Sequence, residues 1–244
     1  MYLPKILIGT PTYEGKNYCI EEFIDNVAKF TYPRSRFEFV IFDNSATPEN
    51  AKYISKKYGV KVMWKDYSGM GVIEKLAQTH EEVRLYAINN KFDYLLHLES
   101  DVFPESDVIE RLLWTKKSVI GVPYQLFGGG QRRVVTQPLK YWDISNSICA
   151  NIYQLARHHQ WWFDGTVKRV STNGIGCTLM KVNAIKNIPF RFVPDNDSAP
   201  DTWFTLDLIA NGVHYYVHTG MVAFHWNNED WGAYANLLKY DKSE

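Results

Sequence analysis

Two carboxylates that could hold a divalent cation stand two residues apart in the middle of the chain. Glu99 and Asp101, separated by Ser100, come directly after the apolar run 94–98. In an extended segment, residues two apart point to the same side, so both carboxylates can face one ligand. Mg²⁺ and Mn²⁺ prefer oxygen ligands, and nucleotide sites commonly offer them one or two carboxylates. The spacing alone also suits a solvated loop, but its place after a strand-like run favours a metal site.

Three further polar residues stand at the ends of predicted elements. Asp43 and His225 each follow a predicted strand, and Asp201 precedes a predicted helix. Ligands of open α/β sheets bind at the carboxyl ends of strands, which favours Asp43 and His225 as site residues. His225 could be a metal ligand or a satisfied polar residue near the surface. Asp201 could be a general base, a helix N-cap, or both.

The elements that must position these residues alternate in type along the first half of the chain. Short apolar runs alternate with helical patterns, which is typical of βαβ units around a mainly parallel sheet. Predicted strands cover 5–9, 37–42, 60–64, 94–98, 119–122, 177–180, 213–217 and 221–224. Predicted helices cover 17–30, 48–58, 72–90, 106–114 and 202–210. Between 124 and 171 the hydrophobic residues follow neither the helical nor the strand periodicity. Two interpretations of this segment remain, a mobile loop and a plain connection.

Composition describes a globular chain with no strong electrostatic preference. The 244 residues are 45% hydrophobic and 22% charged, which favours one α/β domain with its own core. Lys plus Arg equals Asp plus Glu at 27 each, so net charge favours neither nucleic acid nor an anionic membrane. Cys19, Cys149 and Cys177 lack the spacing of a disulfide framework or zinc site. With no long apolar segment near the N-terminus, these observations favour a cytoplasmic protein.

Several segments together resemble glycosyltransferase family two and its relatives with the GT-A fold. TPTYE at 10–14 is similar to the opening that follows the family's first strand. YLLHLESDVFP at 94–104 looks like the family's hydrophobic strand with its acid, any residue, acid signature. DNDSAPDTWFTLDL at 195–208 resembles the acceptor-side motif, and FHW at 224–226 is similar to the segment that offers a metal its histidine.

The resemblance implies an α/β fold in which a Rossmann-like nucleotide-binding half joins an acceptor-binding half. A mainly parallel mixed sheet flanked by helices would form one GT-A domain over 1–244. The nucleotide-sugar-binding half would be 1–123, and the acceptor-binding half would be 124–244, with 124–171 as its candidate mobile loop.

The resemblance also implies roles for individual residues. Asp101 is the direct ligand of Mn²⁺ or Mg²⁺ and His225 a second ligand, while Glu99, where the family usually has Asp, reaches the ribose or a metal-bound water. Asp201 matches the catalytic base, and Asp197 is the alternative because the family often has two acids there. The expected donor-binding residues are Thr10, Pro11, Tyr13, Glu14, Asp43, Glu99 and Ser100.

The implied reaction is displacement of a nucleoside diphosphate from the anomeric carbon of a sugar by an acceptor hydroxyl. A base on the far face of the sugar favours inversion, although retaining enzymes share the fold. The partners would be a nucleoside-diphosphate sugar and a hydroxyl acceptor, either a glycan, a small molecule, a protein or a modified nucleic acid. His80 and Glu81 stand where relatives often have Arg then Asn, so Arg84 is either a substitute phosphate contact or a surface residue.

Two alternative functions remain at this point. A sugar nucleotidyltransferase would normally show a Gly-rich, basic loop after the first strand, which 9–17 lacks. A catalytically inactive nucleotide- or glycan-binding module would not need a base, so the joint presence of Asp43, Asp101, Asp201 and His225 argues against it.

Overall fold

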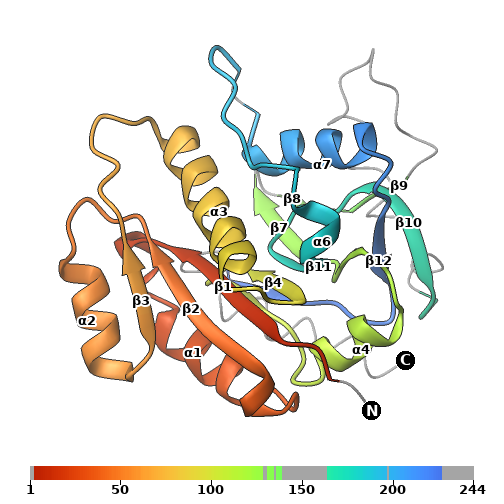
Figure 1. The fold of residues 1–244 in the computed structure, drawn as a ribbon, viewed down its shortest axis with the longest axis horizontal. Helices are drawn as coiled ribbons and strands as arrows, with labels where there is room; N and C mark the ends of the chain where they lie inside the picture. The colour runs from red at the N-terminus through yellow and green to blue at the C-terminus, as the bar shows by residue number, and fades with distance from the viewer. Residues whose placement is uncertain (1–2, 129–130, 135, 139–163, 197, 227–244) are drawn as a thin grey trace.

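The computed structural model describes residues 3–128, 131–134, 136–138, 164–196 and 198–226. Within them, one nine-stranded sheet runs through the molecule (Figure 1). In spatial order its strands are β3 (Lys61–Trp64), β2 (Phe37–Asp43), β1 (Ile6–Thr12), β4 (Tyr94–Leu98), β11 (Cys177–Lys181), β6 (Val119–Gly121), β12 (Tyr215–His218), β10 (Val167–Thr172) and β9 (Gln137–Pro138). The first four are mutually parallel, whereas β11 and β10 run antiparallel to their neighbours. The predicted α/β fold with a mainly parallel mixed sheet is confirmed.

Helices cover both faces of this sheet, and each face has its own apolar core. One face carries α1 (Ile20–Ala28), α2 (Glu49–Tyr58) and α4 (Val108–Trp114), and the other carries α3 (Val72–Asn89), α6 (Val182–Ile185) and α7 (Pro200–Ala210) (Figure 1). In α1 the buried residues Ile20, Phe23 and Val27 recur at helical spacing, which explains why this segment docks as a helix. Gly9 lets α3 approach β1 closely, since a Cβ there would lie 2.4 Å from Val83.

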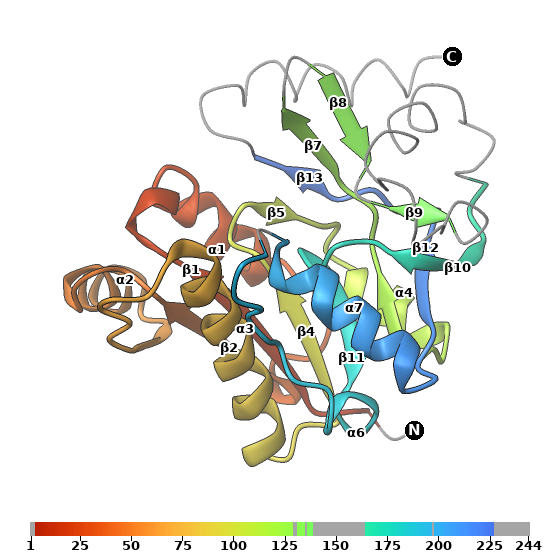
Figure 2. The ribbon, with the colours of Figure 1, turned by 90° about the horizontal axis from the view of Figure 1, so that it is seen from above.

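Two small sheets lie beyond the carboxyl end of β4 (Figure 2). One pairs β5 (Val102–Phe103) with β13 (Phe224–His225), and the other is the hairpin of β7 (Gln125–Gly128) and β8 (Gln131–Val134). Two short 3₁₀ helices, η1 (Glu14–Lys16) and η2 (Arg34–Arg36), complete the described elements. The β5–β13 pair brings the segment near residue 225 against the acidic strand end at residues 99–101.

Several details differ from the sequence prediction. The strand predicted at 221–224 is replaced by β13, in which only Phe224 and His225 pair with β5. β1 continues to Thr12 because its pairing with β2 extends to Thr12↔Asp43. The helix predicted at 17–30 begins only at Ile20, since η1 occupies the preceding turn. The segment 124–171 contains strands β7 to β10 in its described part, and 139–163 lies outside the described residues. None of the described helices combines the length and the apolar character needed to cross a bilayer.

Candidate active site

The acidic segment after β4 is anchored by hydrogen bonds to neighbouring strands. The Glu99 N–H donates to the Gly176 carbonyl at 2.9 Å, and the Val102 N–H donates to the Glu99 carbonyl at 3.0 Å. The hydroxyls of Thr12 and Ser100 lie 3.0 Å apart, which links the ends of β1 and β4. The segment therefore presents its carboxylates from a fixed backbone.

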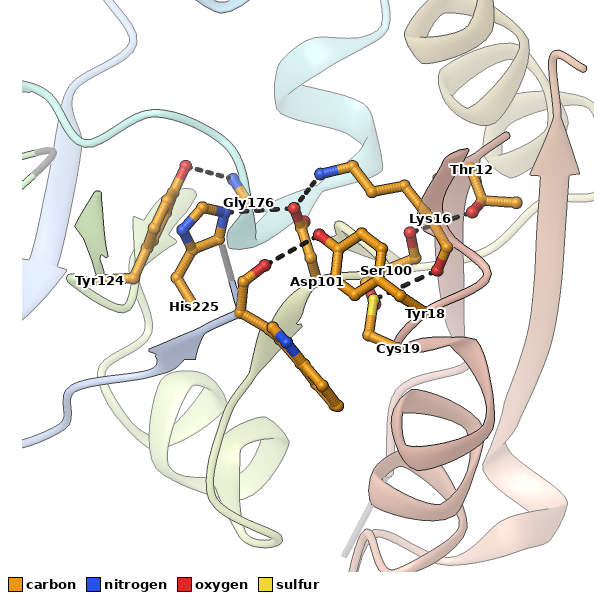
Figure 3. A network of polar contacts seen from close by, with 10 residues as sticks. Thr12, Lys16, Tyr18, Cys19, Ser100, Asp101, Tyr124, Gly176 and His225 are labelled. Carbon is orange, nitrogen blue, oxygen red and sulfur yellow. Dashed lines mark hydrogen bonds and ion pairs between the residues drawn. The ribbon is translucent and has the colours of Figure 1, made fainter. Parts of the chain in front are cut away.

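Asp101 is buried and lies between two basic side chains from distant segments (Figure 3). Its Oδ2 accepts a hydrogen bond from the Lys16 ammonium and lies 3.2 Å from His225 Nε2. Its backbone carbonyl accepts the Trp226 N–H at 2.8 Å. Burial alone would raise the pKa of Asp101, but the His225 hydrogen bond and the Lys16 charge outweigh it and hold that pKa below its usual value. Asp101 is therefore ionised at neutral pH.

Asp101 and His225 have the chemistry and spacing of two ligands to one cation. Two neighbouring ligands of an octahedral ion lie roughly 3 Å apart at ordinary bond lengths, close to the 3.2 Å between Asp101 Oδ2 and His225 Nε2. His225 Nδ1 is buried and has no hydrogen-bond partner among the described residues. No group of three or more His, Cys, Asp or Glu able to hold a metal occurs in the described part of the chain. The residues fit Mn²⁺ or Mg²⁺ only if the ligand and water supply the remaining oxygens.

Asp201 stands at the start of α7 and faces the same acidic segment. It is the second residue of the helix, after Pro200, and Ala199 is the N-cap, so Asp201 is not itself the cap. Its Oδ1 accepts the Thr202 N–H at 2.8 Å. Burial raises the pKa of Asp201 above its ordinary value. The alternative base, Asp197, lies outside the described residues.

Glu99 interacts electrostatically with both aspartates. Burial raises its pKa most, and the negative charges of Asp101 and Asp201 raise it further, to about 8. Glu99 is therefore largely protonated at neutral pH and can donate a hydrogen bond as well as accept one. The structure thus places Glu99 close enough to Asp101 and Asp201 for the three carboxyl groups to interact.

Tyr124 lies beside His225, and the sequence analysis did not identify it as a candidate. Its hydroxyl oxygen accepts the Gly176 N–H at 3.2 Å, and its ring centroid lies 5.6 Å from that of His225. Burial raises the pKa of Tyr124 well above 10, and the charges of Glu99 and Asp201 add to the effect. The only sequence signal was its position just after a strand, in a segment that showed no period.

A second group of unsatisfied polar atoms lies at the ends of β1 and β2. Asp43 is buried; its Oδ1 accepts the Ser45 N–H at 2.9 Å, whereas Oδ2 has no hydrogen-bond partner among the described residues. The Thr10 hydroxyl is likewise buried without such a partner. The Asn50 side chain, in contrast, interacts with the Asp43 carboxyl and opposes the rise in its pKa that burial causes. Buried polar groups are rarely left unpaired, so unpaired ones at strand ends point to a ligand.

The predicted donor residues Pro11, Tyr13 and Glu14 lie in and directly after β1. Pro11 in β1 lies opposite Phe42 in β2, and the Glu14 N–H donates to the Ser45 hydroxyl at 2.9 Å. The exposed Tyr13 ring lies against Gly15, where a Cβ would meet the ring at 2.3 Å.

The helix residues considered as phosphate contacts have structural partners instead. His80 Nδ1 lies 2.7 Å from His97 Nε2, with both rings buried. Arg84 binds Glu81 through two nitrogens at 2.8 and 2.6 Å. Its NH1 also donates to the carbonyls of residues 185 and 186, at 3.1 and 2.8 Å. Arg84 is thus buried and joins α3 to α6, so it is not the surface residue considered from the sequence.

Comparisons with known proteins found similarity in structure only. No family model matches the sequence, and no curated protein matches it either. S. aureus TarS 1–349 in complex with UDP-GlcNAc is 15% identical, with a TM-score of 0.57 over 92% of this chain and 60% of that chain. Mannosyltransferase PcManGT from Pyrobaculum calidifontis in complex with GDP-Man and Mn²⁺ is 14% identical, with a TM-score of 0.59 over 95% of this chain and 60% of that chain. This chain therefore spans about 60% of the length of both structures and has their fold, the GT-A fold.

Proposed function

We propose that this protein is a metal-dependent glycosyltransferase that moves a sugar from a nucleoside-diphosphate donor to a hydroxyl acceptor. The observation that carries the proposal is the convergence of Glu99, Asp101, Asp201 and His225 at the carboxyl end of β4. Three segments far apart in sequence supply these groups. The similar structures that bind UDP-GlcNAc and GDP-Man support a nucleotide-sugar donor.

On the donor side, Asp101 and His225 would hold Mn²⁺ or Mg²⁺ together with oxygens of the donor diphosphate. Such an ion, when bound, acts as a Lewis acid that stabilises negative charge on the leaving diphosphate. Asp43 Oδ2 would accept a hydrogen bond from the base or ribose. Glu99, largely protonated, and Ser100 would contact the ribose. Thr10, Pro11, Tyr13 and Glu14 would complete the pocket.

On the acceptor side, Asp201 would take the proton from the attacking hydroxyl. Its raised pKa makes the Asp201 carboxylate a stronger base than that of an ordinary aspartate. A base that activates the acceptor directly implies displacement with inversion at the anomeric carbon. A positioned general base typically contributes ~10²–10⁴-fold to the rate.

The decisive experiment measures donor hydrolysis and transfer with UDP-GlcNAc and GDP-mannose in the presence of Mn²⁺. Asp201→Asn keeps the side-chain size and can still accept the helix N–H, but it removes the basicity. We expect turnover to fall by ~10²–10⁴-fold while nucleotide affinity stays near the wild-type value. Asp197→Asn is the matched control and should retain turnover.

Two outcomes would contradict this assignment. Loss of turnover in Asp197→Asn with normal turnover in Asp201→Asn would move the base within the motif. A wild-type protein that binds a nucleotide sugar but neither hydrolyses nor transfers it would instead support the inactive binding module.

A further inference from the structure

Lys16 occupies the atom of Asp101 that a metal ion would need. It is the last residue of η1, and its ammonium binds Asp101 Oδ2, the oxygen that also faces His225 Nε2 (Figure 3). Nothing in the sequence reasoning assigned this lysine a role. Figure 3 shows the Lys16 chain extended toward Asp101 from one side while His225 approaches from the other.

The contact between Lys16 and Asp101 compensates a buried negative charge. A buried carboxylate without a partner is strongly unfavourable, and the side chain of Asp101 is only 4% exposed. The Lys16 ammonium supplies the missing positive charge. A divalent ion bound to the same oxygen would be repelled by the positive charge of this ammonium. Each cation therefore weakens the binding of the other to Asp101.

Lys16 can leave Asp101 without disturbing the backbone. The Lys16 N–H donates to the Tyr13 carbonyl at 2.9 Å, and its own carbonyl accepts the Cys19 N–H at 3.2 Å. The side chain is 28% exposed, so the flexible lysine stem has a path toward solvent. Tyr13 and Glu14, which precede it in the same loop, belong to the proposed donor pocket. A diphosphate bound beside this loop would therefore lie near the Lys16 ammonium once that group has left Asp101.

We propose that Lys16 is an internal cation that holds the metal position between Asp101 and His225 until the donor binds. Donor diphosphate then draws the ammonium away, and the divalent ion takes its place on Asp101. Metal and nucleotide would consequently bind cooperatively, and the ion alone would bind weakly. This inference rests on the proposed function, because it assumes that Asp101 and His225 form the metal site.

The test measures binding of Mn²⁺ alone, without nucleotide, by titration with electron paramagnetic resonance of the free ion. We expect Lys16→Met to bind Mn²⁺ about tenfold or more tightly than wild type, since removing a neighbouring like charge is worth more than 1.4 kcal/mol. Lys16→Gln should also increase the affinity for Mn²⁺, and it provides a second neutral variant if Lys16→Met does not fold. Lys16→Arg keeps the charge and should remain close to wild type. Lys52→Met, at an exposed lysine paired with Glu49, controls for the loss of one positive charge.

The cooperativity gives a second readout. Saturating UDP or GDP should increase the Mn²⁺ affinity of wild type, and the increase should be smaller in Lys16→Met. Adding Asp101→Asn to Lys16→Met should remove the new Mn²⁺ site, which would place it at this carboxylate.

The outcomes separate this inference from the function on which it rests. If wild type and Lys16→Met bind Mn²⁺ equally and both require Asp101, the gating role of Lys16 is wrong while the metal site stands. If no variant shows Mn²⁺ binding that depends on Asp101, even with UDP or GDP, the proposed metal site is wrong and this inference falls with it.

Discussion

At the scale of single residues, Asp101 combines a structural and a chemical task. Its backbone carbonyl accepts the Trp226 N–H, which holds the β13 segment in place. Its carboxylate meets His225 and Lys16, which keeps it ionised in a buried setting. The same contacts that place the histidine therefore also prepare the carboxylate for a cation.

Replacing His225 by Ala should weaken metal binding more than it weakens the fold. With UDP or GDP present, we expect Mn²⁺ affinity to fall by about tenfold or more, since one of two protein ligands is lost. The free energy of unfolding should fall by only about 1–2 kcal/mol, because the side chain is buried but small. Calorimetry and urea unfolding measure the two effects. His218→Ala, at the last residue of β12, is the control.

A crystal structure with Mn²⁺ gives an independent check of His225. Metal–nitrogen bonds to imidazole are ~2.0–2.1 Å for ions such as Zn²⁺, and a length only slightly greater is expected here. An imidazole lying several ångströms from the ion would remove His225 from the site.

At the scale of elements, the Arg84–Glu81 pair joins α3 to the end of α6. The guanidinium binds both the Glu81 carboxylate and two α6 carbonyls, and the Phe190 N–H donates to Glu81 Oε2 at 2.9 Å. The ion pair is largely buried, with 6% and 17% of the two side chains exposed. It therefore fixes the helices that cover one face of the sheet.

Arg84→Met should destabilise the protein without affecting donor binding. Removing one partner leaves the Glu81 charge uncompensated, which costs about 3 kcal/mol for a buried pair. The double variant Glu81→Gln/Arg84→Met should recover part of that loss, since no lone charge remains. Urea unfolding measures stability, and nucleotide titration should show unchanged affinity. A variant that keeps its stability but loses nucleotide affinity would instead mean that Arg84 contacts the donor.

At the scale of the whole molecule, the buried His80–His97 pair makes stability depend on pH. His97 Nδ1 lies 3.0 Å from the Ile175 carbonyl, so it carries the proton there, and His97 Nε2 accepts from His80 Nδ1. Burial lowers the pKa of His97 to about 4 and, with the neighbouring His97, lowers the pKa of His80 well below 6.5. Both rings are thus neutral in the folded protein.

The sign of the pH effect follows from these lowered values. Below an unfolded pKa of about 6.5 the unfolded chain binds more protons than the folded one, so stability falls as pH decreases toward 4. Each histidine can contribute a slope of up to ~1.4 kcal/mol per pH unit. Urea unfolding at pH 7 and pH 5 should show this loss in wild type and a smaller loss in His80→Leu/His97→Leu. His214→Gln, at an exposed histidine, should keep the wild-type slope, and equal slopes in all three proteins would contradict the prediction.

Much of the fold was readable from the sequence, because strands and helices are specified by local periodicity and end signals. The strand 94–98 and the acids after it lie where they were predicted, and the parallel strand arrangement followed from the alternation of elements. The strands between 125 and 172 were missed, since no local period marks them. Asp43, Asp101 and His225 were identified because each stands at or just beyond the end of a predicted strand.

Only the tertiary structure decided which groups meet at the site and in which ionisation state. Lys16 reaches Asp101 across 85 positions, and the Tyr18 hydroxyl reaches the Trp226 carbonyl across 208. Tyr124 reaches His225 for the same reason, because the segment after β6 pairs with the segment before β13 through the Tyr124–Ala223 bridge. The sequence supports only an ordinary pKa for Glu99, whereas burial beside two aspartates raises it to about 8. Local patterns specify elements, but contacts and desolvation between distant segments exist only after the chain has folded.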